Sequence, residues 1–292
     1  MNLVIEHLSK TYPNGVKALN DLSLTINRGM FGLLGPNGAG KSSLMRTIAT
    51  LQEADEGQVR LGEIDVLNDK DAVRRVLGYL PQEFGVYPRM SAEAMLDHIA
   101  ILKGITRPKE RKDVVAALLH QTNLFDVRKK HLGGYSGGMK QRFGIAQALL
   151  GNPKLIIVDE PTAGLDPAER NRFLDLLSEI GENVIVILST HIVEDVKELC
   201  TQMAIINKGR VLLSGNPVEA IESVHGKIWK KFIHKSELET FQREFDIIST
   251  RLVAGKTEIH VYADSQPDPS FHPTETDLED VYFHTLKNGA TV

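Results

Sequence analysis

The chain has 292 residues, of which 42% are hydrophobic, and this length suffices for one large domain with an appended region. Its formal net charge of −4 is small and spread along the chain, which excludes the basic footprint typical of nucleic-acid-binding proteins, so we expect no nucleic-acid partner. A single cysteine, Cys200, excludes an internal disulfide, and its apolar neighbours indicate a buried thiol in a cytosolic protein.

Short strands open the chain and lead into a phosphate-binding loop. Residues 4–8 (VIEHL) and 22–26 (LSLTI) are predicted strands with a turn at residues 13–15 between them, and an apolar strand follows at residues 30–34. The next stretch, GPNGAGKSS, matches the P-loop pattern G-x-x-x-x-G-K-[ST], and a helix is predicted from there to about Leu51. The expected nucleotide-binding residues are Gly35, Pro36, Asn37, Gly38, Ala39, Gly40, Lys41, Ser42 and Ser43.

The residue types of this loop suit a phosphate chain and its metal ion. Glycines at positions 35, 38 and 40 permit turns that a Cβ would obstruct, so successive N–H groups converge on a phosphate at the start of the helix. Lys41 is expected to reach the β- and γ-phosphates as a point charge. Ser42 is expected to offer its oxygen to a bridging Mg²⁺.

The middle of the chain changes from strands to helices and back. A strand-like VRLGEIDV lies at residues 59–66, and an apolar strand at residues 76–82 is stopped by Pro81. Long helices are predicted between Ser91 and about Phe125, with apolar residues at 95, 96, 99 and 102. The continuous apolar runs LIIVDE (155–160) and VIVILSTH (184–191) then predict a parallel sheet buried on both faces.

An acidic pair ends the first of these apolar runs. At the carboxyl end of a strand, Asp159 would emerge where open α/β sheets bind ligands, and it is expected to hold Mg²⁺ together with Ser42. Glu160 is expected to polarise the attacking water as a general base. Two solvated acids could equally cap a strand without any catalytic role, but the P-loop upstream favours the catalytic interpretation.

The segment YSGGMKQR, residues 135–142, indicates a second phosphate site. Ser136 is a good N-cap for a helix predicted to begin near Met139, and Gly137 and Gly138 leave backbone N–H groups open to an anion. With this segment in place, the chain resembles the nucleotide-binding subunit of an ATP-binding cassette (ABC) transporter, whose usual signature is L-S-G-G-Q. Tyr135 replaces the usual Leu before the Ser-Gly-Gly core, and Met139 replaces the usual Gln after it. The intact Ser-Gly-Gly core implies that these three residues hold the γ-phosphate of ATP.

The resemblance covers residues 1 to about 220 and implies roles for further residues. Tyr12 matches the aromatic residue that stacks on adenine, Gln82 matches the glutamine that senses Mg²⁺ and the attacking water, and His191 matches the switch histidine at the γ-phosphate. PTAGLD, residues 161–166, matches the D-loop, which in the family crosses to the other subunit. The expected catalytic residues are Glu160, His191 and Gln82, and the expected Mg²⁺ ligands are Ser42, Gln82 and Asp159.

The expected fold is α/β, a P-loop NTPase domain of the ABC type with an antiparallel β subdomain and a helical subdomain at about 84–150. This ATPase domain would occupy residues 1–225, and a small C-terminal α+β extension residues 226–292. The P-loop would lie on the sheet core and the signature on the helical insertion. The resemblance therefore implies a homodimer, or a pair of ATPase subunits, bound head to tail with ATP and Mg²⁺ between them.

Transport through a membrane requires a partner, because no apolar run approaches the roughly 20 residues of a membrane helix. The resemblance implies an ATPase peripheral at the inner, cytoplasmic face of the cell membrane, attached to an integral membrane permease subunit. In the family, the groove after the Q-loop glutamine accepts a short helix of that subunit. Phe84, Val86 and Tyr87 are expected to be exposed at this groove. The alternative is that their side chains fold back onto the domain core.

The C-terminal region favours export. Its last predicted helix, LEDVYFHTL at residues 278–286, is similar to the last helix of ATPases that pair with ABC-2 type membrane proteins. The alternative function is that of a non-transport ABC ATPase of the translation or DNA-repair type. Those proteins usually carry two cassettes in one chain or a long coiled coil before the signature, and the short interval between Lys41 and Ser136 fits neither arrangement.

Overall fold

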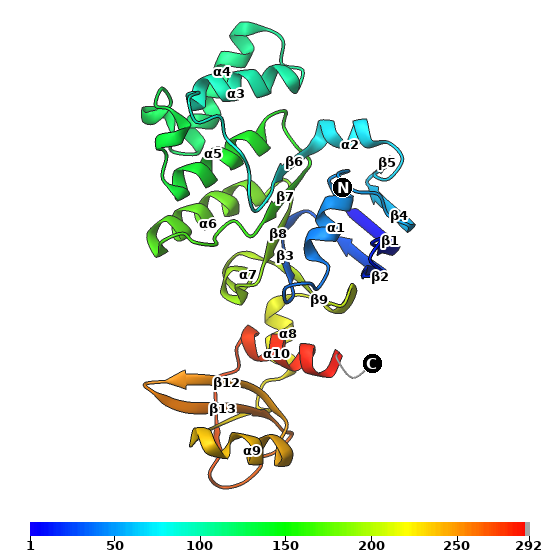
Figure 1. Ribbon diagram of the computed structural model, residues 1–292, viewed down its shortest axis with the longest axis vertical. Coiled ribbons are helices and arrows are strands. Elements are labelled where there is room, and N and C mark those ends of the chain that lie inside the picture. The colour runs from blue at the N-terminus through cyan, green and yellow to red at the C-terminus, as the bar shows by residue number, and fades with distance from the viewer. Residues whose placement is uncertain (290–292) are drawn as a thin grey trace.

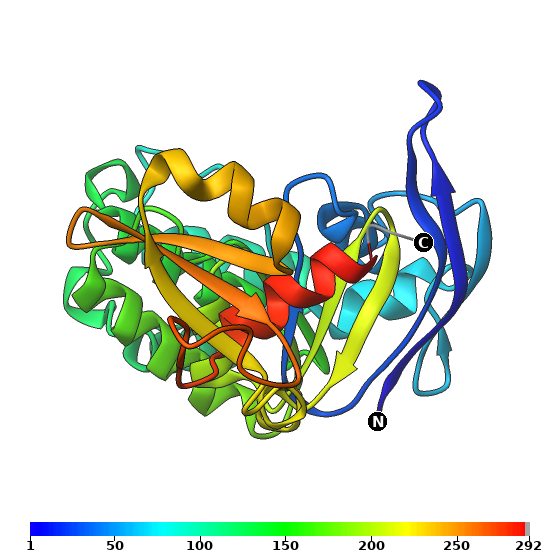
Figure 2. The same ribbon diagram turned by 90° about the horizontal axis from the view of Figure 1, so that it is seen from below.

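The computed structural model describes residues 1–289, which form a central body with a helical end and a C-terminal lobe at the opposite end (Figure 1). An antiparallel sheet at one side of the body has the strand order β2 (Lys17–Ile26), β1 (Leu3–Thr11), β4 (Glu56–Leu61) and β5 (Ile64–Asp65). The hairpin of β1 and β2 projects from the body at this side (Figure 2). Among the described residues, no helix has the length and apolar character to cross a membrane.

The central sheet carries the strand ends that position the site. Its spatial order is β10 (Arg210–Gly215), β9 (Gln202–Asn207), β3 (Gly29–Leu34), β8 (Ile185–Thr190), β7 (Leu155–Asp159) and β6 (Leu77–Leu80). All neighbouring pairs from β9 to β6 are parallel, so their carboxyl ends meet at one edge. Every residue of β7 and β8 is buried, which confirms the prediction of a sheet covered on both faces.

Alternate residues of these strands enter two separate cores. Ile157 faces a cluster shared with the antiparallel sheet and helix α1 (Lys41–Ile48), whereas Ile156 and Val158 face a cluster shared with helices on the other side. The second cluster includes apolar residues of α5 (Gly137–Leu149), α6 (Pro167–Gly181) and α7 (Val193–Leu199). A short helix, α2 (Lys70–Val76), precedes β6 and contributes Val73 to the first cluster.

The helical end contains α3 (Ala92–Leu102), α4 (Pro108–Gln121), the amino-terminal part of α5 and the turns η1 (Phe125–Val127) and η2 (Leu132–Gly134). These elements share a cluster of their own, in which Leu96, Leu119 and Phe143 are fully buried. Pro108 begins α4, and Ser91 caps α3 by accepting from the N–H of Ala94.

The C-terminal lobe is an antiparallel sheet between two helices. Its strand order is β12 (Ile247–Val253), β13 (Lys256–Tyr262), β11 (Ile228–Ile233) and β14 (His272–Pro273). The turn η3 (Lys235–Glu237) and α9 (Leu238–Glu244) lie on the outer face, and α10 (Leu278–Gly289) lies between the sheet and the body (Figures 1 and 2). Helix α8 (Pro217–Ser223) connects the body to the lobe.

Several local predictions require correction. The stretch 59–66 is two strands, because Gly62 turns the chain at a φ of 58° between β4 and β5. Leu102 ends α3 with 73% of its surface exposed and is not part of the buried face with Met95 and Leu96. Helix α5 begins at Gly137, two residues before the start that we expected at Met139.

Candidate functional site

A pocket of about 390 Å³ lies where the carboxyl ends of the parallel strands face the loop between β3 and α1. Its lining combines that loop with single residues that follow β6, β7 and β8, and with residues of the β1–β2 hairpin. The lining residues are Tyr12, Val16, Ala18, Pro36, Asn37, Gly38, Ala39, Gly40, Lys41, Ser42, Ser43, Gln82, Glu160 and His191. The parallel sheet thus assembles residues that are far apart in the sequence.

The loop backbone explains the glycines before α1. Gly40 has a φ of 108°, and a Cβ at this position would lie 2.4 Å from the carbonyl oxygen of Ala18. Only glycine meets both requirements, and the turn directs the first N–H groups of α1 toward the pocket. The partial positive charge of a helix N-terminus suits such a loop to bind phosphate.

Lys41 lines the pocket and is held by the backbone of the loop. Its Nζ donates hydrogen bonds to the carbonyl oxygens of Gly35 at 2.5 Å and of Pro36 at 3.4 Å. The same Nζ lies 3.9 Å from Glu160 Oε1. Burial lowers the pKa of Lys41, and the carboxylates of Glu160 and Asp159 oppose that shift. A phosphate chain would add further negative charge beside this buried ammonium.

Oxygen donors suitable for Mg²⁺ are grouped beside this lysine. Ser42 Oγ donates to Asp159 Oδ2 at 3.5 Å, and Asp159 is 6% exposed at the end of β7. Burial is the main cause of the raised pKa of Asp159, so a cation next to this carboxylate would stabilise its charged form. A hydroxyl and a carboxylate at this distance match the hard oxygen ligands that Mg²⁺ prefers, and Gln82 lines the same pocket.

Glu160 and His191 form a close pair over the pocket. His191 Nδ1 lies 2.6 Å from Glu160 Oε2, and the Glu160 N–H donates to the Ser189 carbonyl oxygen at 2.8 Å. Glu160 has a φ of 48°, in the left-handed region that costs a non-glycine residue energy. Strained backbone and a carboxylate held by a histidine are features that cluster at catalytic sites.

The predicted signature residues lie apart from this pocket. Ser136, Gly137 and Gly138 are not among the described residues that line the P-loop pocket. Ser136 is exposed and caps α5 by accepting from the N–H of Met139 at 3.2 Å, which confirms its prediction as an N-cap. The carboxylate of Glu169 on α6 packs where a Cβ of Gly138 would lie. One copy of the chain therefore contains two separate candidate phosphate sites.

Sequence reasoning missed part of the pocket wall. Val16 and Ala18 line the pocket on the side of the β1–β2 hairpin, next to Tyr12. Tyr12 Oη lies 3.0 Å from Ser43 Oγ and donates to Gln52 Oε1 at 2.8 Å. No motif marks these apolar residues, because their proximity to the P-loop depends on how the antiparallel sheet packs against the body.

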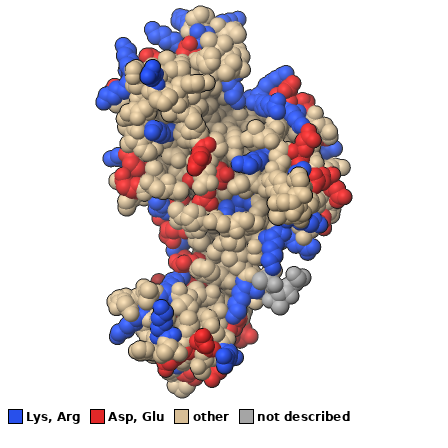
Figure 3. Space-filling model, in the orientation of Figure 1, with Lys and Arg blue, Asp and Glu red and all other residues tan. Residues whose placement is uncertain are grey.

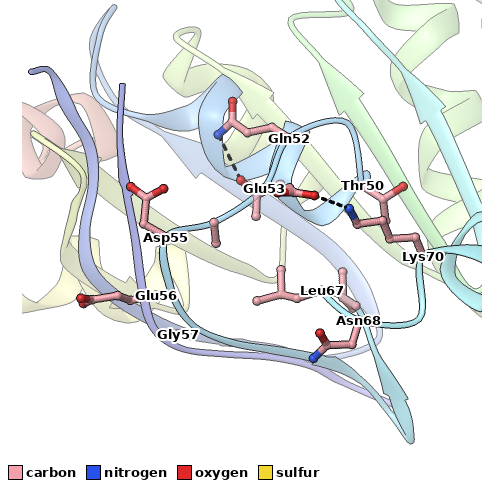
Figure 4. A pocket seen from close by; sticks show the side chains of 12 residues that line it. Thr50, Gln52, Glu53, Asp55, Glu56, Gly57, Leu67, Asn68 and Lys70 are labelled. Atoms are coloured by element: carbon pink, nitrogen blue, oxygen red, sulfur yellow. Dashed lines mark hydrogen bonds and ion pairs between the residues drawn. The ribbon is translucent and has the colours of Figure 1, made fainter. Parts of the chain in front are cut away.

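A neighbouring hollow of about 360 Å³ lies between α1 and strand β4 (Figure 4). Its rim carries Glu53, Asp55 and Lys70. The ammonium of Lys70 pairs with Glu53 at 2.8 Å, and Asp55 pairs with Lys10 at 2.8 Å. These charges already have partners within the chain, so we assign the hollow no ligand.

Comparison with known proteins identifies the family. Residues 19–163 match the family model described as ABC transporter. The ABC transporter ATP-binding protein YxlF of Bacillus subtilis is 35% identical over 248 residues, which are 85% of this chain and 81% of YxlF. The chain belongs to the ABC transporter family. The daunorubicin/doxorubicin resistance ATP-binding protein DrrA of Streptomyces peucetius is 32% identical over 89% of this chain and 77% of DrrA.

A solved ABC cassette shares the architecture of the body. The dimeric post-hydrolysis structure of the cassette MJ0796, bound to ADP and Pi, superposes with a TM-score of 0.66 and 27% identity over 73% of this chain and 98% of that one. The predicted fold and family are thereby confirmed. As a member of this family, the chain is an ATP-binding and ATP-hydrolysing motor subunit of a transporter.

Proposed function

We propose that this chain drives export by binding ATP and Mg²⁺ in a head-to-tail dimer and by passing the resulting motion to a separate membrane permease subunit. One observation carries the proposal. The P-loop pocket contains Lys41, Glu160 and His191, whereas the signature serine Ser136 is exposed on another surface of the same chain. A second copy, or a paired ATPase subunit, would bring its Ser136 over the open pocket, and two-fold symmetry would close both sites at once.

The proposed roles follow from the geometry of the pocket. Lys41 and the loop N–H groups would bind the phosphates, and Tyr12 would contact the adenine. Ser42, Gln82 and Asp159 would hold Mg²⁺, which supplies charge neutralisation at the phosphates when it is bound. Glu160 would accept the proton of the attacking water, and His191 would hold the Glu160 carboxylate in position.

Export is the direction that the relatives favour. DrrA is named for daunorubicin and doxorubicin resistance, and YbhF of Escherichia coli, of which this chain spans 53%, is named a probable multidrug transporter protein. We propose a peripheral location at the cytoplasmic face of the membrane, through the permease. We also propose the division into an ATPase domain of residues 1–225 and an accessory region of residues 226–292.

The dimer is the part of this proposal that can be tested with the purified chain. In a Glu160→Gln background, which blocks hydrolysis, sedimentation with ATP and Mg²⁺ is expected to show a dimer, and sedimentation without nucleotide a monomer. Ser136→Arg places a bulky side chain where the hydroxyl would meet phosphate, so it is expected to abolish the dimer while nucleotide still binds at the P-loop. An ATP-dependent dimer that persists in Ser136→Arg would contradict the head-to-tail arrangement.

A further inference from the structure

Asp195 on α7 is a fully buried carboxylate to which the proposed function assigns no role. Its exposed fraction is 0%, although an unpaired charge at such a position would be costly. Its two oxygens have partners on different elements. Asp195 Oδ1 accepts from Arg170 Nε of α6 at 2.7 Å, and Asp195 Oδ2 accepts from Thr162 Oγ1 at 2.6 Å.

These partners connect Asp195 to both members of the catalytic pair. Thr162 is 3% exposed and lies two residues after Glu160, at the start of the D-loop. Thr190 directly precedes His191, and its Oγ1 donates to Asp195 Oδ2 at 3.5 Å. The same hydroxyl accepts from the N–H of Ile192 at 3.0 Å, which holds the turn after β8. One carboxylate therefore contacts the segments that carry Glu160 and His191.

The surroundings keep this carboxylate in one place. Arg170 Nη2 lies 2.6 Å from Asp195 Oδ1 and 3.3 Å from Glu198 Oε2, so its guanidinium joins α6 to α7. Charge-assisted hydrogen bonds of this kind are stronger and more directional than neutral ones, and they strengthen further away from water. The backbone strain at Glu160 requires such support, because a residue at a φ of 48° persists only where neighbouring contacts hold it.

We infer that Asp195 is a positioning residue for ATP hydrolysis. By binding Thr162 and Thr190 together, it sets the position of the Glu160 carboxylate relative to the His191 ring and ties the D-loop to the switch segment. Movement of the D-loop by the second subunit would then shift the pair through Thr162. This inference rests on the proposed roles of Glu160 and His191.

The sharpest test removes one hydroxyl from this network. Thr162→Val preserves the shape of the side chain and abolishes its hydrogen bond to Asp195. We expect kcat for ATP hydrolysis by the full chain to fall about 10- to 100-fold, as small misplacements of catalytic groups do, while KM for ATP stays nearly unchanged. Thr162→Ser keeps the hydroxyl and is expected to restore turnover.

Thr122→Val is the matched control. Thr122 is 0% exposed, and its hydroxyl donates to the carbonyl oxygen of Leu118 at 2.8 Å in the helical end, so the same substitution removes a buried hydrogen bond far from the pair. Its kcat is expected to match that of the wild type. If Thr162→Val does not fold by circular dichroism, Asp195→Asn replaces it, because that change removes the charge that Arg170 pairs with and is expected to lower kcat at constant KM.

Parallel measurement of Glu160→Gln separates the possible failures. If Glu160→Gln loses turnover but folded Thr162→Val keeps the kcat of Thr122→Val, the positioning role of Asp195 is wrong and the proposed function stands. If Glu160→Gln keeps near wild-type turnover, the role of Glu160 is wrong, and the inference about Asp195 falls with it. Loss of kcat in Thr162→Val with rescue in Thr162→Ser supports the inference.

Discussion

At the scale of single residues, the site is a small set of largely buried charges that line one pocket. Lys41 is 6% exposed and Glu160 is 8% exposed. Lys41 Nζ lies 3.9 Å from Glu160 Oε1. The two side chains have different expected roles even though they interact. Lys41 stands at the P-loop where phosphate would bind, whereas Glu160 is held by His191 at the strand end, where its carboxylate would accept a proton from the attacking water.

These roles predict different kinetic defects for two substitutions. Glu160→Gln is expected to keep ATP affinity and to lose most turnover, because a general base contributes roughly 10²- to 10⁴-fold. Lys41→Ala is expected to weaken ATP binding itself. Equilibrium binding of a fluorescent ATP analogue and steady-state phosphate release measure the two effects separately. Near wild-type phosphate release by Glu160→Gln would remove Glu160 from the catalytic role.

At the scale of elements, the segment between β6 and α3 directs some of its apolar side chains into the body and others into solvent. Phe84 and Val86 pack against the cluster of the helical end, and Phe84 also touches the cluster beneath the central sheet. Both residues are half-buried, so they fold partly back onto the body, as the alternative expectation had it, and only part of their surface faces solvent. Tyr87 is 64% exposed and remains available to a partner. The proposed permease contact at this segment thus depends on Tyr87.

Tyr87→Glu is expected to detach the subunit from its permease without unfolding it. The substituted side chain points into solvent, so the cost to stability should be small, whereas a charge in an apolar contact is costly. Co-purification of the membrane subunit with tagged wild-type and variant chains measures this. Val218→Glu on α8, where Val218 is 65% exposed, is the matched control and is expected to retain the partner. Wild-type yield of the permease with Tyr87→Glu would place the contact elsewhere.

At the scale of the whole molecule, the C-terminal lobe is joined to the catalytic body through a shared core. Helix α10 contributes Leu278, Val281 and Tyr282 to the cluster that also contains β9 and α7. Asp280 Oδ1 also accepts a hydrogen bond from His260 Nδ1 of β13 at 2.7 Å, which fixes the helix to the lobe. The lobe stands out from the body beyond a narrower waist, and charges of both signs are interspersed over the visible face (Figure 3).

The shared core predicts that α10 stabilises the entire chain. Leu278 is 0% exposed, so Leu278→Ala removes buried apolar surface and leaves a cavity between α10 and the body. The free energy of unfolding is expected to fall by about 2–5 kcal/mol. Urea denaturation followed by fluorescence of Trp229 in β11 and by circular dichroism of the whole chain measures this fall.

Leu252→Ala is the control for this experiment, because Leu252 is 78% exposed and its truncation is expected to leave stability nearly unchanged. If Leu278→Ala lowers only the stability of the lobe, the two transitions will separate, and the lobe then folds independently of the body. Coincident transitions at lower urea would instead indicate that body and lobe unfold together.

The sequence by itself determined the strand-loop-helix at the P-loop, the buried parallel strands and the order of the phosphate-binding elements. These features depend on local chemistry. Gly40 at a φ of 108° and the fully apolar β7 and β8 each leave a signal in a short window of residues. The same local reasoning placed the cap at Ser136 and the strand-end residues Asp159 and Glu160, which the folded chain brings beside Lys41.

Only the tertiary structure decided which of these features meet. The place of Val16 and Ala18 in the pocket wall, the packing of Phe84 and the network around Asp195 arise from contacts between residues that are distant in the chain. No spacing rule within one segment reports such contacts, because each depends on how whole sheets and helices pack. In the sequence, Asp195 is one of several acidic residues in a polar segment. It connects Thr162, Thr190 and Arg170 in the interior only when α6, α7 and the D-loop come together.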